Sequence, residues 1–165
     1  MIISEDISVI GIQIEYVKEI ITPHGIFNII IDQDFIPGNN VFVDLYSVIS
    51  FLKESLNDGL VRLERENVPE IGSTPLSKID FSEETPCSLI YLDFGELSNK
   101  GFVFHLGFNG EYERLIYSLD SEQTYQEKIY QRGTMQNLIE AIPGCDELKS
   151  IRRNEMISLT DIRGM

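Results

Sequence analysis

The sequence has few basic residues. Lysine and arginine together number 13, against 27 aspartate and glutamate residues, so the formal net charge is 13 − 27 = −14. Because proteins hold nucleic-acid phosphates largely through lysine and arginine, this balance argues against nucleic acid and anionic membrane as ligands. It favours a basic partner, which an acidic protein attracts over long distances. A simpler interpretation, that acidity keeps the protein soluble, explains the same charge.

Cysteine is almost absent, and long hydrophobic runs are missing. Cys87 and Cys145 are the only cysteines and do not form a CxxC pair, so they indicate neither a disulfide framework nor a metal site. No stretch approaches the roughly 18 apolar residues of a membrane-spanning helix. The N-terminal sequence MIISEDISVI has acids where a signal peptide carries basic residues. We therefore expect free thiols and a cytosolic protein.

The residue patterns of common catalytic and cofactor sites are also missing. His24 and His105 are the only histidines, so a histidine-based metal centre would need both. There is no GxSxG elbow, no phosphate-binding GxxxxGK[ST] loop and no GxGxxG after a strand. Asp32 and Asp34 resemble the start of a calcium loop, but the sequence FIP follows where further oxygen ligands are needed. We predict no catalytic residue, no cofactor and no metal.

Two segments near the N-terminus predict strands. Residues 8–17 alternate between apolar and polar, which is the period-two pattern of a half-buried strand. Residues 26–31 (IFNIII) are apolar on both faces except for one asparagine, which favours a strand covered on both sides. The sequence PHG at 23–25 is expected to break the chain, and DQD at 32–34 to turn it towards a short strand at 35–36.

The clearest predicted helix begins after Asp44, whose carboxylate can accept hydrogen bonds from the first free amides. Apolar residues at helical spacing follow as far as Leu56. The sequence NDG at 57–59 is expected to end the helix. Residues 66–87 contain three prolines and have no regular pattern, so we interpret them as an irregular loop that is either functional or simply mobile.

The C-terminal half is rich in predicted strands. Residues 88–94 and 102–108 read as strands, and Asn109-Gly110 then predicts a type I′ hairpin turn, because both residues tolerate positive φ. Residues 124–131 favour a further strand over the competing helix. Thr134 is expected to cap a short helix that ends before Pro143-Gly144, and residues 154–165 form a poorly defined tail.

The order of these elements predicts the fold class. Strands come in consecutive runs with helices inserted between them, which is typical of an α+β fold. We expect a single domain over residues 1–165, with one antiparallel sheet of about five to seven strands and two or three helices mainly on one face.

The first third of the chain resembles the immunity proteins of bacterial polymorphic-toxin and contact-dependent growth inhibition systems. The residues that carry the resemblance are GIFNIIID at 25–32, FIPG at 35–38 and the helix from Leu45 to Leu56. They are similar to one immunity family with a G-x-F-N strand, a turn, an I-P step and a leucine-bearing helix. The resemblance implies a non-enzymatic protein that binds a cognate toxin domain, usually a nuclease, and blocks its active site or an adjacent surface.

The resemblance also implies where the partner binds. Toxin nucleases are commonly basic because they hold phosphate, so an acidic inhibitor gains association rate and specificity. We therefore treat the acids of the irregular segment and of the early turn as candidate partner-binding residues, although solvation of a loop explains any one of them equally well. These candidates are Asp32, Asp34, Glu64, Glu66, Glu70, Asp80, Glu83 and Glu84.

Two other functions fit the same residues. A nucleic-acid mimic, or another acidic regulatory module that occupies a basic groove of a host protein, would need acids spaced about 7 Å apart along one face, as phosphates are. A small carboxylate-based enzyme would need two or more acids in one pocket with shifted pKa values. The sequence does not indicate the oligomeric state.

Overall fold

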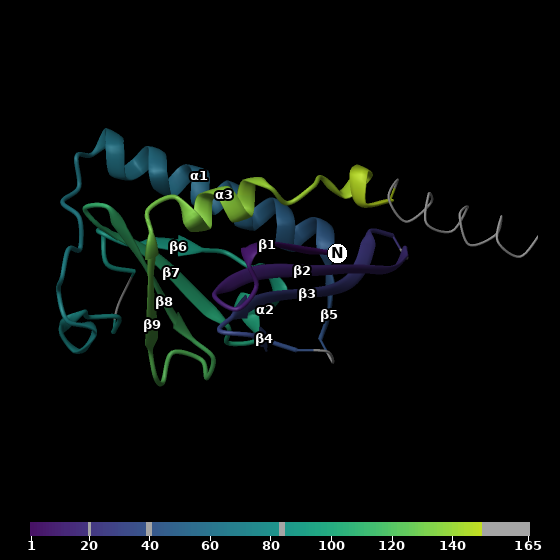
Figure 1. Cartoon of the computed structure of the whole chain (residues 1–165), viewed down its shortest axis with the longest axis horizontal. Coiled ribbons are helices and arrows are strands. Elements are labelled where there is room, and N and C mark those ends of the chain that lie inside the picture. The colour runs from purple at the N-terminus through teal and green to yellow at the C-terminus, as the bar shows by residue number, and fades with distance from the viewer. Residues whose placement is uncertain (20, 39–40, 83–84, 150–165) are drawn as a thin grey trace, which may run out of the picture. The chain divides into compact units, whose positions relative to one another are not determined.

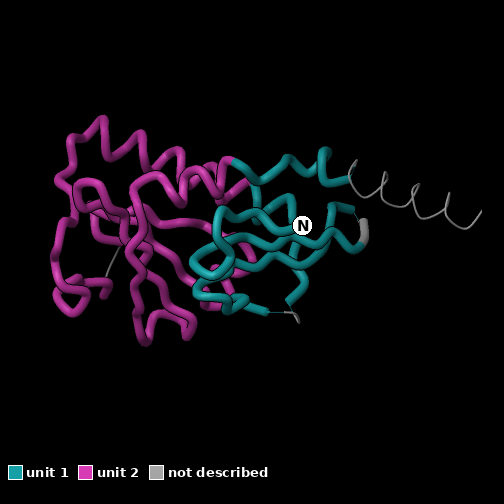
Figure 2. Tube along the Cα trace, in the orientation of Figure 1, with its two compact units in different colours: residues 1–49, 141–165 teal, residues 50–140 magenta. Residues whose placement is uncertain are grey.

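The computed structural model describes residues 1–19, 21–38, 41–82 and 85–149, and the chain divides into two compact units (Figure 2). Unit 1 comprises residues 1–49 and the residues from 141 onward, and unit 2 comprises residues 50–140. The predicted α+β class with antiparallel pairing is confirmed. The described strands, however, form two sheets of five and four strands, where one sheet was expected (Figure 1).

Unit 1 contains the five-stranded sheet, in the order β1-β2-β3-β4 with β5 also paired to β3. Its strands are β1 (Ile2–Asp6), β2 (Ile10–Glu19), β3 (Pro23–Ile31), β4 (Asp34–Ile36) and β5 (Phe42–Asp44). The strands β4 and β5 share one edge of β3, because β4 pairs with its last three residues and β5 with residues 24–26. The predicted alternation in β2 is confirmed, since Ile10, Ile12 and Ile14 are buried.

The strand β3 begins earlier than the sequence predicts. The sequence PHG at 23–25 does not break the chain but forms the start of β3, paired with β2. Pro23 is the first residue of the strand, a position that β-sheets tolerate for proline. Gly25 lies so close to the backbone of Glu15 and to Leu45 that any side chain there would collide with them. This glycine therefore permits close packing of the strand.

The turn between β3 and β4 is confirmed. Asp32 and Gln33 have φ values of 50° and 74°, and Ile31 pairs with Asp34. Two central residues with positive φ define a type I′ turn, whose twist suits a tight hairpin. Asp32 thus lies in the turn itself, and Asp34 begins β4.

The helix α1 (Leu45–Arg65) starts as predicted and ends later. Asp44 caps it, because its Oδ1 accepts hydrogen bonds from the amides of Tyr46 at 2.9 Å and Ser47 at 3.3 Å. The predicted end at 57–59 is wrong. A side chain at Gly59 would collide with Ile90, so this glycine lets the helix approach a neighbouring strand and does not terminate it.

Unit 2 contains the four-stranded sheet, in the order β6-β7-β8-β9. Its elements are η1 (Leu76–Lys78), β6 (Ile90–Leu92), α2 (Glu96–Asn99), β7 (Val103–Asn109), β8 (Tyr112–Ser118), β9 (Gln126–Gln131) and α3 (Thr134–Glu140). The strand that we favoured at 124–131 is confirmed as β9. The hairpin after Asn109 is also confirmed, but only Gly110 has positive φ, at 60°, which indicates a type II′ turn instead of type I′.

The cap of α3 comes from a distant residue. The carboxylate of Glu113 in β8 accepts hydrogen bonds from the amides of Met135 at 2.6 Å and Gly133 at 2.8 Å. The hydroxyl of Thr134, the predicted cap, instead donates to the carbonyl of Gln131. Glu113 is fully buried, and this desolvation raises the pKa of its carboxyl group.

None of the helices in the described ranges has both the length and the apolar character needed to cross a membrane. The predicted C-terminal tail at 154–165 lies outside the described residues, as do Glu83 and Glu84.

Candidate functional site

The structure divides the six candidate acids that it describes between the two units. Asp32 and Asp34 belong to unit 1, whereas Glu64, Glu66, Glu70 and Asp80 belong to unit 2. All six are exposed.

Glu64 and Glu70 line one cleft of unit 2, with a volume of about 310 Å³. Leu60 and Leu63 of α1 contribute apolar lining, and Arg132 contributes a positive charge. Within the part of the chain that the structure describes, no group bonds to the carboxylate of Glu64. The cleft therefore has a mixed polar and apolar lining, to which Glu64 contributes an exposed carboxylate.

Glu70 has an internal structural role. Its Oε1 accepts a hydrogen bond from Nη1 of Arg132 at 2.6 Å, and its Oε2 accepts one from the amide of Gly110 at 2.7 Å. The bond from Arg132 has the largest effect on the pKa of Glu70, and together with the bond from Gly110 it holds this pKa below its usual value. The Arg132 guanidinium also lies 4.4 Å from the ring centre of Phe108. Glu70 thus fastens the start of the irregular segment to the β7–β8 hairpin.

Glu66 and Asp80 also have local partners. Glu66 Oε1 lies 2.9 Å from Nη2 of its neighbour Arg65, and both side chains are exposed. Asp80 Oδ1 accepts a hydrogen bond from the amide of Ser82 at 2.9 Å, and hydrogen bonds from Ser82 lower the pKa of Asp80. Such exposed local bonds contribute little to stability, and water or a partner competes for them readily.

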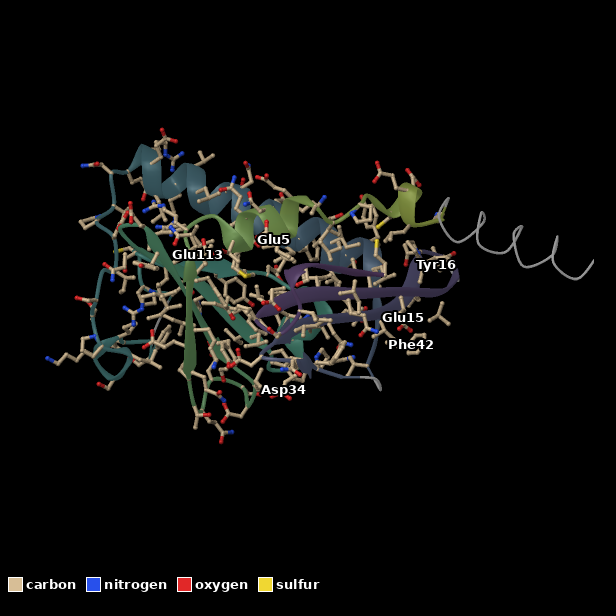
Figure 3. The ribbon with its side chains drawn as sticks, viewed as in Figure 1. Glu5, Glu15, Tyr16, Asp34, Phe42 and Glu113 are labelled. Atoms are coloured by element: carbon tan, nitrogen blue, oxygen red, sulfur yellow. The ribbon has the colours of Figure 1, made fainter. Side chains whose placement is uncertain are left out.

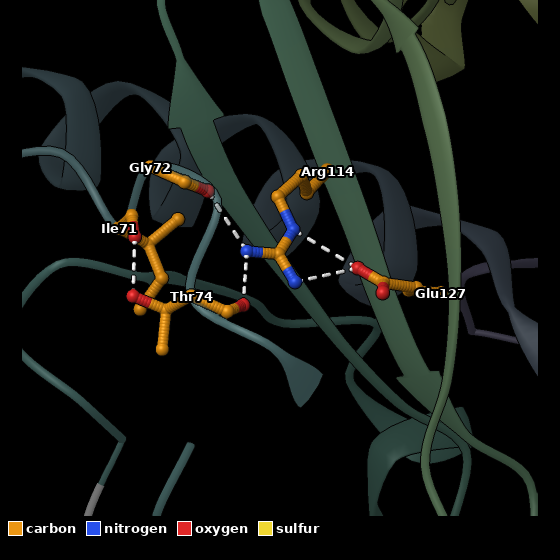
Figure 4. Close-up of polar contacts among 5 residues, drawn as sticks. All are labelled: Ile71, Gly72, Thr74, Arg114 and Glu127. Carbon is orange, nitrogen blue, oxygen red and sulfur yellow. Dashed lines mark hydrogen bonds and ion pairs between the residues drawn. The ribbon is translucent and has the colours of Figure 1, made fainter. Parts of the chain in front are cut away.

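Residues 70–82, which we call the strap, are attached to the sheet of unit 2. Arg114 of β8 is only 4% exposed, and its Nη1 donates to the carbonyls of Gly72 at 2.9 Å and Thr74 at 2.7 Å (Figure 4). Its Nε and Nη2 bond to Oε2 of Glu127 at 2.9 and 2.7 Å. One buried arginine thus joins two strands and the strap, a role that the sequence analysis missed.

The far end of the strap rests on aromatic rings. Phe81 stacks on Tyr125 with ring centres 3.9 Å apart and lies 5.2 Å from the ring centre of His105. His105 is 2% exposed, and among the described residues neither of its ring nitrogens has a hydrogen-bond partner. Burial therefore lowers its pKa to about 4, and the imidazole is neutral at pH 7.

The described residues do not include any group of three or more histidine, cysteine, aspartate or glutamate side chains placed to hold a metal ion. Glu113, which lies beside the cleft, accepts two backbone amides and is engaged in the fold. What unit 2 presents to a partner is a hollow with exposed carboxylates around it. What unit 1 presents is the acidic turn at Asp32 and Asp34.

Comparison with known proteins identifies two similarities. The family model for immunity protein 42 matches residues 1–144. A solved structure described as CdiI from Burkholderia dolosa AUO158 has a TM-score of 0.57 and 14% sequence identity, over 85% of this chain and 96% of that one. At that identity the likeness shows a shared fold. No match was found among the curated proteins.

Proposed function

The chain belongs to the immunity protein 42 family, and from that premise we propose that it binds a basic nuclease toxin domain and covers its active site or an adjacent surface. Membership of an immunity family carries the general function, which is neutralisation of a cognate toxin by binding. Such a role does not require catalytic residues in the immunity protein.

One observation supports a basic partner, namely the uncompensated charge of 27 acids against 13 bases. A nuclease must hold phosphate groups and therefore carries lysine and arginine around its active site. An acidic inhibitor attracts such a surface from a distance, which raises the association rate and disfavours wrong partners. We place the complex in the cytosol, where the free thiols of Cys87 and Cys145 would stay reduced.

We propose the exposed acids as contact residues. The carboxylate of Glu64 has no bond to any described residue, Glu66 and Asp80 have weak local bonds, and Asp32 and Asp34 lie at an exposed turn. Glu83 and Glu84 belong to the same proposed set. Glu70 is the least suited of them, because binding a partner would require it to give up the hydrogen bonds from Arg132 and Gly110.

The test uses the toxin domain encoded by the neighbouring reading frame. We expect co-expression of this chain to restore growth of cells that produce that domain, and the two proteins to co-purify. The association rate should fall about tenfold when the ionic strength is raised from 50 to 300 mM, because salt screens the attraction. Failure to restore growth would refute the immunity function, and a rate independent of salt would refute the basic partner.

A further inference from the structure

The sheet of unit 1 has a second face, opposite its buried isoleucines. Residues paired across neighbouring antiparallel strands point to the same side of a sheet. The strand register therefore defines two rows on this face, which run through β2, β3 and either β5 or β4. The rows are Glu15–Ile26–Phe42 and Gly11–Ile30–Phe35. We call this surface the Phe35/Phe42 face.

Two phenyl rings on this face are open to solvent. Phe42 is 45% exposed and Phe35 is 41% exposed, although each lies at the same edge of β3. Their partners Ile26 and Ile30 are four positions apart, so the rings stand roughly 13 Å from each other along the strand. Ile2, which pairs with Gln13 on the same face, is 50% exposed. Large apolar groups gathered on one face mark an interaction surface more often than scattered ones do.

The middle of the face is held by hydrogen bonds. Asn28 is fully buried, its Nδ2 donates to Oε1 of Gln13 at 2.8 Å, and its Oδ1 accepts from the amide of Gly38 at 2.8 Å. Gln13 Nε2 in turn donates to Oε1 of Glu15 at 2.7 Å. This chain of bonds orients the Glu15 carboxylate in the same row as Phe42, at one end of the sheet (Figure 3). A surface ordered in advance loses less conformational entropy when it binds.

The charge around the face identifies its partner. Residues 1–49 contain seven acids and a single base, Lys18. Glu15 lies in the Phe42 row, whereas Asp34, the neighbour of Phe35 in the edge strand β4, pairs with Ile31 and belongs to the opposite face. A second copy of this chain would bring like charges together. A basic protein surface, in contrast, would cover the phenyl rings and neutralise the rim.

We propose that the cognate toxin domain docks on the Phe35/Phe42 face, with both rings inserted into apolar depressions that are bordered by its arginine or lysine side chains. Aromatic residues in the centre of an interface, surrounded by polar groups, supply most binding energy in many complexes. This role for the face rests on the proposed function, and it identifies the aromatic contacts that the candidate acids alone do not provide.

The experiment measures the affinity of the full chain for a catalytically inactive form of the toxin domain encoded by the neighbouring reading frame. Phe35→Ala and Phe42→Ala should each weaken binding by roughly tenfold or more, and the double variant by roughly a hundredfold. Glu15→Lys should slow association severalfold without touching an aromatic ring. The matched control is Phe51→Ala, because Phe51 of α1 is 46% exposed and lies off this face, so affinity should not change.

The outcomes separate this inference from the function on which it rests. If the original chain does not bind the toxin domain, the proposed function fails and the docking face fails with it. If the chain binds and all four variants of the face retain full affinity, the docking face is wrong and the immunity function stands. Thermal unfolding of each variant shows whether a lost affinity reflects lost folding. A dimer of the free chain that Phe35→Ala and Phe42→Ala dissociate would also overturn the proposal.

Discussion

The two units use their acidic residues differently. In unit 2 three acids hold groups of their own unit, since Glu127 pairs with Arg114, Glu70 pairs with Arg132 and Glu113 caps α3. Residues 1–49 of unit 1 contain seven acids but only one base, Lys18. The acids that hold unit 2 together are therefore less available to a partner than an exposed acid of unit 1 such as Asp34.

The two sheets also differ in how their faces are covered. In unit 2 the strap crosses the face that carries His105 and Arg114. In unit 1 the Phe35/Phe42 face leaves two phenyl rings more than two-fifths exposed. Exposed aromatic rings at the edge of a sheet are suited to binding, even though Asn28 and Ile30 in the middle of this face are buried. This difference indicates unit 1 as the main contact region.

Replacement of Arg114 should have the largest effect on stability. Arg114→Ala leaves the carbonyls of Gly72 and Thr74 and the carboxylate of Glu127 without their donor, and loss of one partner of a buried ion pair typically costs about 3–5 kcal/mol. Urea unfolding measures the change in the free energy of unfolding. The control is Arg65→Ala, at an exposed pair, which should have no measurable effect. A loss below about 1 kcal/mol would show that the strap is not held by this network.

Acid should destabilise unit 2 through His105. Its pKa is about 4 in the folded protein and 6.5 as a free group, so folding favours the neutral ring. Stability is complete above pH 6.5 and is lost as the pH falls towards 4, by roughly 3 kcal/mol for a shift of this size. His105→Phe should remove this part of the pH dependence. Unfolding curves at pH 7, 5 and 4 give the free energy of unfolding of both proteins. If this free energy falls equally with pH in both, His105 is not the cause of the loss.

Loss of the α3 cap should have a smaller effect. Glu113→Ala leaves the amides of Gly133, which is half-buried, and Met135, which is buried, without an acceptor, which costs about 1–3 kcal/mol. Hydrogen exchange should then be faster at these two amides than elsewhere in unit 2. Glu140→Ala serves as the control on the same helix, because Glu140 is exposed. Unchanged exchange at both amides would show that the helix start does not depend on Glu113.

The smallest expected effect compares single charges in the two units. Asp34→Lys should slow association with the toxin domain by roughly threefold, because a reversed rim charge acts mainly on the association rate. Glu66→Lys should change it less, since Glu66 already lies beside Arg65. Stopped-flow mixing at low salt measures both rates. A larger effect at Glu66 would move the main contact region to unit 2.

Local patterns predicted the elements that local forces form. The alternation in β2, the Asp44 cap and the turn at Asp32 depend on residues within a few positions of one another, so the sequence was sufficient. The end of α1 was mispredicted because Gly59 makes room for Ile90 of β6, a contact that the local sequence does not reveal. The cap of α3 was misassigned to Thr134 because the residue that caps it, Glu113, lies in β8 and is distant in the sequence.

The sequence by itself determined the acidity, the α+β class and the resemblance to immunity proteins, since composition and period are properties of the chain alone. Only the tertiary structure decided that Arg114 attaches the strap, that Glu70 is engaged by Arg132, and that Phe35 and Phe42 share one face. The physical reason is that a side chain's role depends on what faces it. Strand register and packing bring those partners together from distant parts of the chain.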